Sequence, residues 1–145
     1  SLNLENSKLS ERVELGAALA ANKLRAVGVI ERSSGKLVEN SNARRVDKIR
    51  ACYTVPQNRL SDAGDRMLYV QVLDPKKRVL GENKKVNFEG VEVAYSAISK
   101  FYYENNALDI CENVSPAGEE FAEGTYQVNI FDEGKLISQT SFSLN

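Results

Sequence analysis

Residues 46–55, read VDKIRACYTV, constrain the fold of this chain more than any other segment. Apolar and polar residues alternate along them, which is the two-residue period of a β-strand with one buried face. That face carries four apolar side chains: Ile49, Ala51, Tyr53 and Val55. Pro56 follows, and because proline has no N–H to donate to a neighbouring strand, the strand is expected to end there. The segment therefore predicts a strand packed on a hydrophobic core.

The same period recurs along the chain after residue 22. Extended segments between turn-forming residues are expected near 24–30, 36–39, 46–55, 67–74, 86–93, 95–103, 107–114, 125–131 and 135–144, and the piece at 86–93 is broken by Gly90. No helical stretch lies between them to serve as the crossover that parallel strands need. The pattern predicts an all-β fold, an antiparallel β-sandwich of seven to nine strands.

Two of these segments carry further detail. In 67–74, Leu68, Val70 and Val72 share one face of the strand. The opposite face carries Met67, Tyr69, Gln71 and Leu73. Between 125–131 and 135–144, Asp132, Glu133 and Gly134 predict a hairpin with a three-residue loop, in which glycine takes the left-handed position.

Residues 1–21 predict the one helix of the chain, because they contain good helix formers, no proline and a single glycine. A 4-3-4-3-4 spacing marks a heptad-like stripe: Leu2, Asn6, Leu9, Val13, Gly16 and Ala20. An Asn at an a position favours a parallel two-stranded coiled coil. Since the stripe is short, a single helix packed on its own domain is the alternative. The expected division is 1–21, an N-terminal helix or coiled-coil end, and 22–145, a β-sandwich domain.

The charge balance argues against binding to nucleic acid. The chain has nineteen Lys and Arg residues and twenty Asp and Glu residues, which gives a net charge of −1. Binding to DNA or to an anionic membrane needs a concentrated positive charge on the protein surface. No apolar run approaches the roughly 20 residues that span a bilayer. Contact with a membrane is expected only through an anchor upstream of this sequence.

The sequence lacks histidine and the motifs of the common catalytic and cofactor-binding sites. The chain has no histidine, which excludes Ser-His-Asp and Cys-His nucleophile systems, and its two cysteines do not complete a four-ligand zinc site. Phosphate-binding, dinucleotide-binding and EF-hand spacings are not found. We expect a protein that is not an enzyme and that holds no cofactor or metal.

Aromatic residues concentrate in 95–103, at Tyr95, Phe101, Tyr102 and Tyr103. In a strand, alternate positions face outward, and an outward ring can stack on a sugar. Tyr95 and Tyr102 are the candidates for such stacking. This arrangement favours a carbohydrate-binding β-sandwich as the alternative function.

The segment FAEGTYQV, residues 121–128, resembles the corner before the sixth strand of immunoglobulin-like and fibronectin type III-like domains. In that corner, a Gly-x-Tyr sequence lets a buried tyrosine hydroxyl bond to nearby backbone, and the matching positions are Gly124 and Tyr126. Val128 stands where antibody-type domains have a cysteine, and the chain has no Trp. The resemblance is therefore to the broader immunoglobulin-like class.

Taken whole, the order of helix and strands is similar to the C-terminal portion of poorly characterised bacterial envelope proteins, in which a coiled coil leads into a β-sandwich. This resemblance implies an extracytoplasmic module, periplasmic or envelope-associated, with no assigned reaction. The expected function is a non-catalytic structural or protein-interaction role on a helical stalk. The expected partner is another protein or a second copy bound through the N-terminal helix.

The two cysteines are interpreted on the same resemblance. An immunoglobulin-like order makes 46–55 the second strand and 107–114 the fifth, so that Cys52 and Cys111 become neighbours in one sheet with both sulfurs facing solvent. This implies a Cys52–Cys111 disulfide. Two free thiols remain the alternative.

Overall fold

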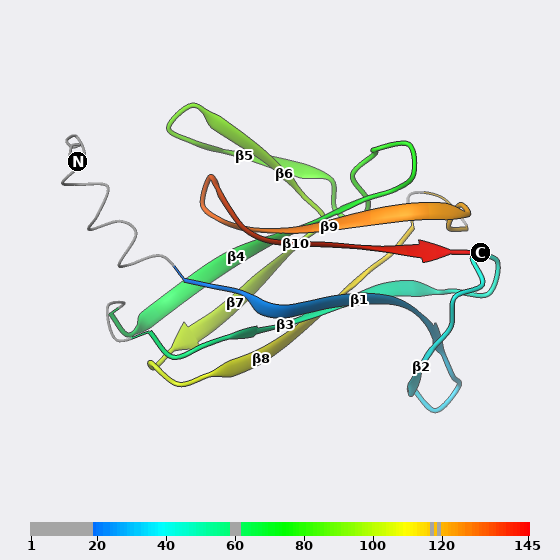
Figure 1. Ribbon diagram of the computed structural model, residues 1–145, viewed down its shortest axis with the longest axis horizontal. Helices are drawn as coiled ribbons and strands as arrows, with labels where there is room; N and C mark the ends of the chain where they lie inside the picture. The colour runs from blue at the N-terminus through cyan, green and yellow to red at the C-terminus, as the bar shows by residue number, and fades with distance from the viewer. Residues whose placement is uncertain (1–18, 59–61, 117, 119) are drawn as a thin grey trace.

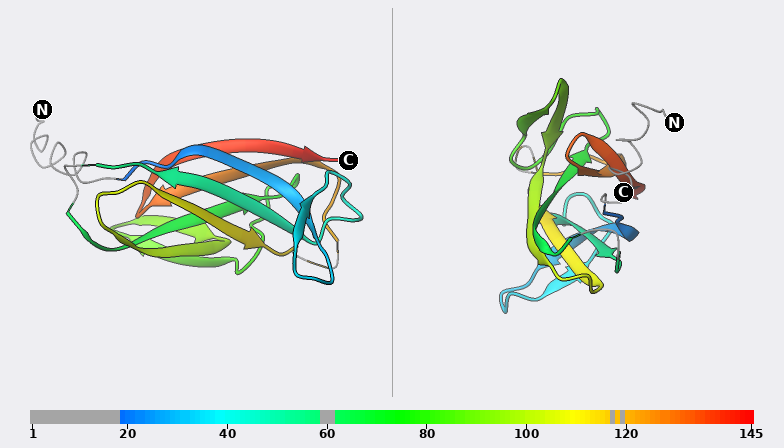
Figure 2. Two further views of the ribbon diagram at one scale, coloured as in Figure 1. Left: turned by 90° about the horizontal axis from the view of Figure 1, so that it is seen from below. Right: turned by 90° about the vertical axis from the view of Figure 1, so that its left-hand side faces the viewer.

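The computed structural model describes residues 19–58, 62–116, 118 and 120–145. They form two layers of antiparallel strands and a separate two-stranded ribbon (Figure 1, Figure 2). The strands of the described residues are β1 (Asn22–Glu31), β2 (Leu37–Glu39), β3 (Lys48–Val55), β4 (Gly64–Leu73), β5 (Lys84–Phe88), β6 (Val91–Tyr95), β7 (Ala97–Tyr103), β8 (Leu108–Val114), β9 (Gly124–Asp132) and β10 (Lys135–Leu144). The predicted all-β antiparallel sandwich is confirmed.

The strand order follows the immunoglobulin-like pattern. The first sheet has the order β2-β1-β3-β8 and the second β10-β9-β4-β7. Apart from β2 and the β5–β6 ribbon, seven strands of the described residues remain. The first, second and fifth of these, β1, β3 and β8, share one sheet, and the third, sixth and seventh, β4, β9 and β10, share the other. Immunoglobulin-like sandwiches divide their strands in this way. The fourth, β7, joins the second sheet beside β4.

The core lies between the two sheets and is built from their inward positions. Ile49 of β3, Val70 of β4 and Val128 of β9 have no exposed surface and belong to one hydrophobic cluster. Burial of each such side chain stabilises the fold by about 1.5–3 kcal/mol. β3 alternates as predicted, with Tyr53 and Val55 also buried. The alternation in the sequence therefore reports two facing layers.

The described residues contain ten strands, so the predicted number of seven to nine is wrong. Residues 86–93, predicted as an extended piece broken by Gly90, belong to a hairpin in which β5 and β6 pair on either side of the Glu89–Gly90 turn. Residues 95–103, also predicted as one strand, are interrupted at Ser96. The backbone N–H of Val72 donates to the Ser96 hydroxyl at 2.9 Å, which fixes the point where the chain leaves the ribbon and joins the second sheet as β7.

The β9–β10 hairpin is present, but the predicted three-residue loop is wrong. Asp132 pairs with Lys135, so only Glu133 and Gly134 form the turn. The left-handed residue is Glu133, with φ of 54°, and not the glycine. Gly134 lies close to the ribbon, because a Cβ there would be 3.1 Å from side-chain carbons of Val91 and would require Val91 to shift.

The predicted N-terminal helix falls largely outside the described residues, which begin at residue 19. Residues 19–21 have no helical structure, so the helix does not extend to residue 21 as predicted. Leu19 and Ala21 are buried in the hydrophobic core. The backbone N–H of Leu19 donates to the Asp132 carboxylate at 3.1 Å, which ties this segment to the end of β9.

Candidate functional site

A disulfide joins the two cysteines on the outer face of the first sheet. Cys52 of β3 lies directly opposite Cys111 of β8, with the Cα atoms 4.1 Å apart and the sulfurs bonded at 2.10 Å. Cys111 is exposed and Cys52 is half-buried. Arg50 lies on the same face and points a guanidinium nitrogen at the Cys111 sulfur, 3.7 Å away. The implied bridge is present, and it fastens the edge strand β8 to the central strand β3.

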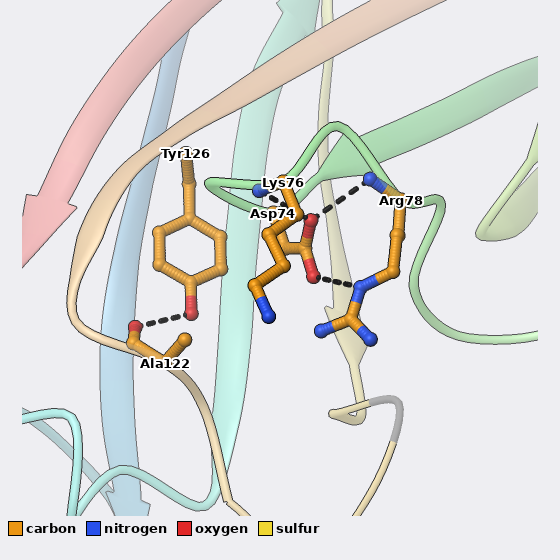
Figure 3. A network of polar contacts seen from close by, with 5 residues as sticks. All are labelled: Asp74, Lys76, Arg78, Ala122 and Tyr126. Atoms are coloured by element: carbon orange, nitrogen blue, oxygen red, sulfur yellow. Dashed lines mark hydrogen bonds and ion pairs between the residues drawn. The ribbon is translucent and has the colours of Figure 1, made fainter.

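Gly124 and Tyr126 lie where β9 begins (Figure 3). The buried Tyr126 hydroxyl donates to the Ala122 carbonyl at 2.6 Å. Gly124 has φ of 133°, and a Cβ there would come within 2.9 Å of the Pro75 ring. Burial raises the pKa of Tyr126, and the negative charge of Asp74 raises it further. This corner holds backbone in place and presents no reactive group.

Asp74, next to this corner, is a buried carboxylate with a structural role. One oxygen accepts the backbone N–H groups of Lys76 (2.9 Å) and Arg78 (2.8 Å), and the other accepts Nε of Arg78 at 2.8 Å (Figure 3). Burial alone would raise the pKa of Asp74, but these hydrogen bonds and the positive charge of Arg78 outweigh burial and lower it. The carboxylate closes the turn that follows β4.

A second polar group is buried between the sheets. The Tyr53 hydroxyl makes no hydrogen bond of good geometry within the described part of the chain, although the Ser99 hydroxyl, which donates to Glu112 at 2.8 Å, lies near it. Burial raises the pKa of Tyr53 to about 12. Neither this hydroxyl nor Asp74 is placed to act on a substrate.

The surface feature that stands out is a group of exposed apolar side chains on the second sheet. Four large ones are exposed among the described residues, by 45% to 56%: Met67, Val91, Tyr102 and Leu136. Three of them belong to strands of this sheet, namely β4, β7 and β10, and all three face outward. We call these four residues the apolar end patch.

The four residues lie toward the same end of the second sheet but are spread across it, with Leu136 on the edge strand β10, Tyr102 on the opposite edge strand β7 and Met67 between them on β4. Tyr102 pairs with Asp65 near the beginning of β4, and Leu136 pairs with Phe131 beside the β9–β10 turn. Val91, at the ribbon tip, packs against that same turn at Gly134. Figure 1 shows the β9–β10 turn, the ribbon tip and the beginning of β1 together at the left. Concentrated exposed apolar groups of this kind mark interaction sites.

The ribbon is anchored to the sheet by aromatic rings. Tyr69 of β4 contacts Phe88 and Tyr95, with ring centroids 5.4 Å apart in both pairs. Gln71 adds a hydrogen bond from its side-chain amide to the Ala94 carbonyl at 2.9 Å. These contacts cover the middle of the outer face of the second sheet and leave the apolar end patch uncovered.

The two tyrosines considered for sugar stacking lie apart. Tyr95 ends β6 and packs on Tyr69, whereas Tyr102 is exposed near the end of β7. Between Ala97 and Tyr102, β7 advances about 17 Å at about 3.4 Å per residue. The structure therefore does not bring the two rings together on one platform.

The first sheet carries a shallow groove on its outer face, with an apolar floor of Val27, Val29 and Leu37. Arg25 at its rim is paired with Glu39 at 3.2 Å, so its charge is compensated. Groups of three or more Cys, Asp or Glu side chains that could hold a metal are not found in the described part of the chain. Among those residues, no helix is long and apolar enough to cross a membrane.

The sequence did not reveal the apolar end patch, although one signal was present. Met67 was placed on the outward face of its strand together with Tyr69 and Leu73, so both faces of that strand are largely apolar. A strand with water on one side normally has a polar outward face. The excess of apolar residues on that face was the available sign of a covered or binding surface.

Two solved structures are similar to this chain. One is a β-glucosidase from Kluyveromyces marxianus, with 14% identity, a TM-score of 0.46 and coverage of 90% of this chain. The chain spans only 15% of the length of that enzyme. The other is an immunoglobulin-like protein from Pseudomonas aeruginosa, with 15% identity, a TM-score of 0.43, and coverage of 90% of this chain and 98% of that one.

None of the curated proteins matches the sequence. A family model described as a domain of unknown function, DUF8428, matches residues 22–145, which is most of the chain. The chain therefore belongs to the DUF8428 family.

Proposed function

We propose that this protein is a non-catalytic structural or protein-interaction module of the bacterial cell envelope, presented on a helical stalk. The observation that carries the proposal is the apolar end patch. Its four residues are each about half exposed, and they lie on the outer face of the second sheet and at the tip of the ribbon beside it. A partner that covers them removes apolar surface from water, which favours association.

The composition of the patch suits a protein partner. Met and aromatic residues such as Tyr are enriched in the centres of protein interfaces, and charged residues are depleted there. Tyr102 and Met67 are of these types, and the charged neighbours Asp65 and Lys100 are exposed beside them on the same face. Asp65 lies opposite Tyr102 and Lys100 opposite Met67, so apolar and charged side chains alternate on this part of the surface.

The disulfide supports the extracytoplasmic part of the proposal. Bridges form and persist in oxidising compartments such as the periplasm and the cell surface, and they are rare in the reducing cytosol. Cys111 is exposed in this bridge, so cytosolic reductants would have access to it. The protein is therefore expected to function outside the cytoplasm.

Site-specific photo-crosslinking in living cells tests the proposed function. A photoreactive amino acid replaces Met67 in one variant and Asn113, an exposed residue on β8 of the first sheet, in the matched control. We expect a protein adduct from position 67 and none from position 113. Adducts from neither position, or from position 113 alone, would contradict the proposal.

The carbohydrate-binding alternative now depends on Tyr102 alone, because Tyr95 is packed on Tyr69. An oligosaccharide array separates the two functions. Binding of a glycan that is lost in Tyr102→Ala would favour the alternative, and an array without binding would leave the protein-interaction function.

A further inference from the structure

We propose that the Cys52–Cys111 disulfide is a thiol–disulfide exchange site, which accepts two electrons from a dithiol that reaches it through the groove on the first sheet. This inference goes beyond the proposed function and does not depend on it. It is carried by the exposure of the bond on an outer face, by the position of the groove beside Cys52, and by the charge of Arg50 beside Cys111.

The bond lies where an external thiol has access to it. It joins the central strand β3 to the edge strand β8 on the outer face of the first sheet, with Cys111 exposed and Cys52 half-buried. Exposed disulfides are among those that exchange with external thiols, whereas structural disulfides of secreted proteins typically resist reduction. The position of this bridge therefore permits exchange in the folded chain.

The groove opens on one side of the bond. It has a volume of about 230 Å³ and is lined by residues of β1, β2 and β3, among them Val27, Leu37 and Cys52. The sheet order β2-β1-β3-β8 puts Cys111 on the far side of Cys52 from this groove. A thiolate attacks one sulfur of a disulfide and displaces the other. Displacement at sulfur is in line, so a thiolate in the groove attacks Cys52 and displaces Cys111.

Arg50 favours the departure of Cys111. Its guanidinium nitrogen lies 3.7 Å from Cys111 Sγ. Arg25, at the rim of the groove, is paired with Glu39 at 3.2 Å, whereas Arg50 pairs with no carboxylate among the described residues. A neighbouring cation stabilises a thiolate, and a more stable thiolate leaves faster. An uncompensated positive charge therefore lies beside the sulfur that the exchange releases.

The exchange proceeds in two balanced steps. The first thiolate of the dithiol bonds to Cys52 Sγ, the Cys52–Cys111 bond breaks, and its electron pair leaves on Cys111 Sγ as a thiolate beside Arg50. The second thiolate of the dithiol then attacks the first sulfur of the dithiol in this mixed disulfide, which closes the dithiol into a disulfide and releases Cys52 as a thiolate. The two protein thiolates take up the two protons that the dithiol has lost. The chain gains two electrons and the dithiol is oxidised.

Reduction of the folded, oxidised chain by dithiothreitol at neutral pH tests the inference, with the new thiols counted by mass spectrometry after alkylation. We expect a rate that is proportional to the dithiothreitol concentration and unaffected by urea below the unfolding transition. Arg50→Gln should slow the reaction about threefold or more, because Cys111 becomes a poorer leaving group. Lys48→Gln removes the same charge from the same face of β3, where Lys48 is paired with Glu31 at 3.4 Å, and should leave the rate unchanged.

A second measurement identifies the sulfur that is attacked. Reduced glutathione, which has a single thiol, replaces dithiothreitol for a short reaction, and iodoacetamide then blocks the released protein thiol. Cys52 and Cys111 lie on different tryptic peptides, so mass spectrometry assigns each group to its residue. We expect glutathione on Cys52 and the alkyl group on Cys111. Circular dichroism establishes that each variant is folded.

Three outcomes would overturn the inference. A disulfide that is reduced only where urea unfolds the chain has a structural role alone. Glutathione on Cys111 places the attack outside the groove, and equal rates in Arg50→Gln and the wild type exclude a role for its charge. If Arg50→Gln does not fold, the urea dependence and the position of glutathione still decide. Photo-crosslinking from position 67 is independent of these results, so the proposed function stands or falls separately.

Discussion

The outer faces of the two sheets differ, although their inner faces contribute to one hydrophobic core. The outer face of the first sheet carries a disulfide and the guanidinium of Arg50 across β3 and β8. The outer face of the second sheet carries an aromatic-anchored ribbon and the apolar end patch. The disulfide on the first face stabilises the domain. The apolar side chains exposed on the second face remain in contact with water, so they contribute little to the stability of the domain.

This difference separates stability from function within one fold. Substitution of side chains that stabilise the domain should lower the free energy of unfolding and leave binding to a partner unaffected. Residues of the apolar end patch should behave in the opposite way. The predictions below test this division, beginning with the largest expected effect on stability.

Removal of the disulfide is expected to have the largest effect. The bridge closes a sequence separation of 59 residues, and the double variant Cys52→Ala, Cys111→Ala should lower the free energy of unfolding by about 2–4 kcal/mol, because the unfolded chain gains freedom. Urea unfolding of the variant and of the wild type measures the difference. If both unfold at the same urea concentration, the first face does not have the role that we assign to it.

The Asp74 carboxylate is expected to come next. Asp74→Asn replaces the carboxylate that accepts hydrogen bonds from Lys76 and Arg78 by an amide. The free energy of unfolding at neutral pH should fall by about 1–2 kcal/mol. The exposed guanidinium of Arg78 adds little to this figure, because solvent screens its charge.

The same residue gives a pH dependence with a defined sign. The pKa of Asp74 is lower in the folded state than in the unfolded chain, so its contribution to stability is present above about pH 4 and is lost as the pH falls through the folded pKa. When the free energy of unfolding is measured from neutral pH to pH 2, it should fall less in Asp74→Asn than in the wild type. Equal losses would contradict this assignment.

Two of the buried tyrosines in the core, Tyr126 and Tyr53, should respond differently to loss of the hydroxyl. Tyr126→Phe removes the hydrogen bond to Ala122 and should cost about 1 kcal/mol. Tyr53→Phe removes a buried hydroxyl that has no hydrogen bond among the described residues, and it should leave stability unchanged or raise it by up to about 1 kcal/mol. Thermal unfolding of the two variants side by side checks the prediction, which a larger loss in Tyr53→Phe would contradict.

The smallest effect on stability is expected in the apolar end patch. Met67→Lys and Tyr102→Ser change exposed side chains and should alter the free energy of unfolding by less than about 0.5 kcal/mol. Denaturant unfolding at a concentration where the chain is monomeric provides the measurement. A loss of more than about 1 kcal/mol would show that these residues support the fold, and the contrast between the two faces would disappear.

The sequence predicted the layers of this fold better than its surface. The alternation around Ile49 and the proline after β3 are local signals, and they were sufficient to place that strand and its buried face. The β5–β6 ribbon was missed, because its position depends on Phe88 and Tyr95 meeting Tyr69, a contact between separate parts of the chain. Periodicity does not report which outer face another element covers.

The candidate site was missed for a related reason. The outward position of Leu136 depends on a register shift between Leu136 and Ser138, which breaks the simple alternation along β10. Val91 belongs to the patch only because the ribbon tip meets the β9–β10 turn. Met67 was placed correctly by parity, but parity alone does not distinguish a half-exposed side chain from one covered by a neighbouring element.

Oxidation of Met67 tests the central claim most directly, because it is the only methionine in the chain and lies 45% exposed in the apolar end patch. Mass spectrometry follows conversion to the sulfoxide by dilute peroxide in the folded chain and in the chain unfolded in urea. If the second face leaves this side chain in water, Met67 should be oxidised at a similar rate in both states, and the sulfoxide form should unfold at the same urea concentration as the unmodified chain. Oxidation that is much slower in the folded chain, or a sulfoxide form that unfolds at a lower urea concentration, would contradict the account.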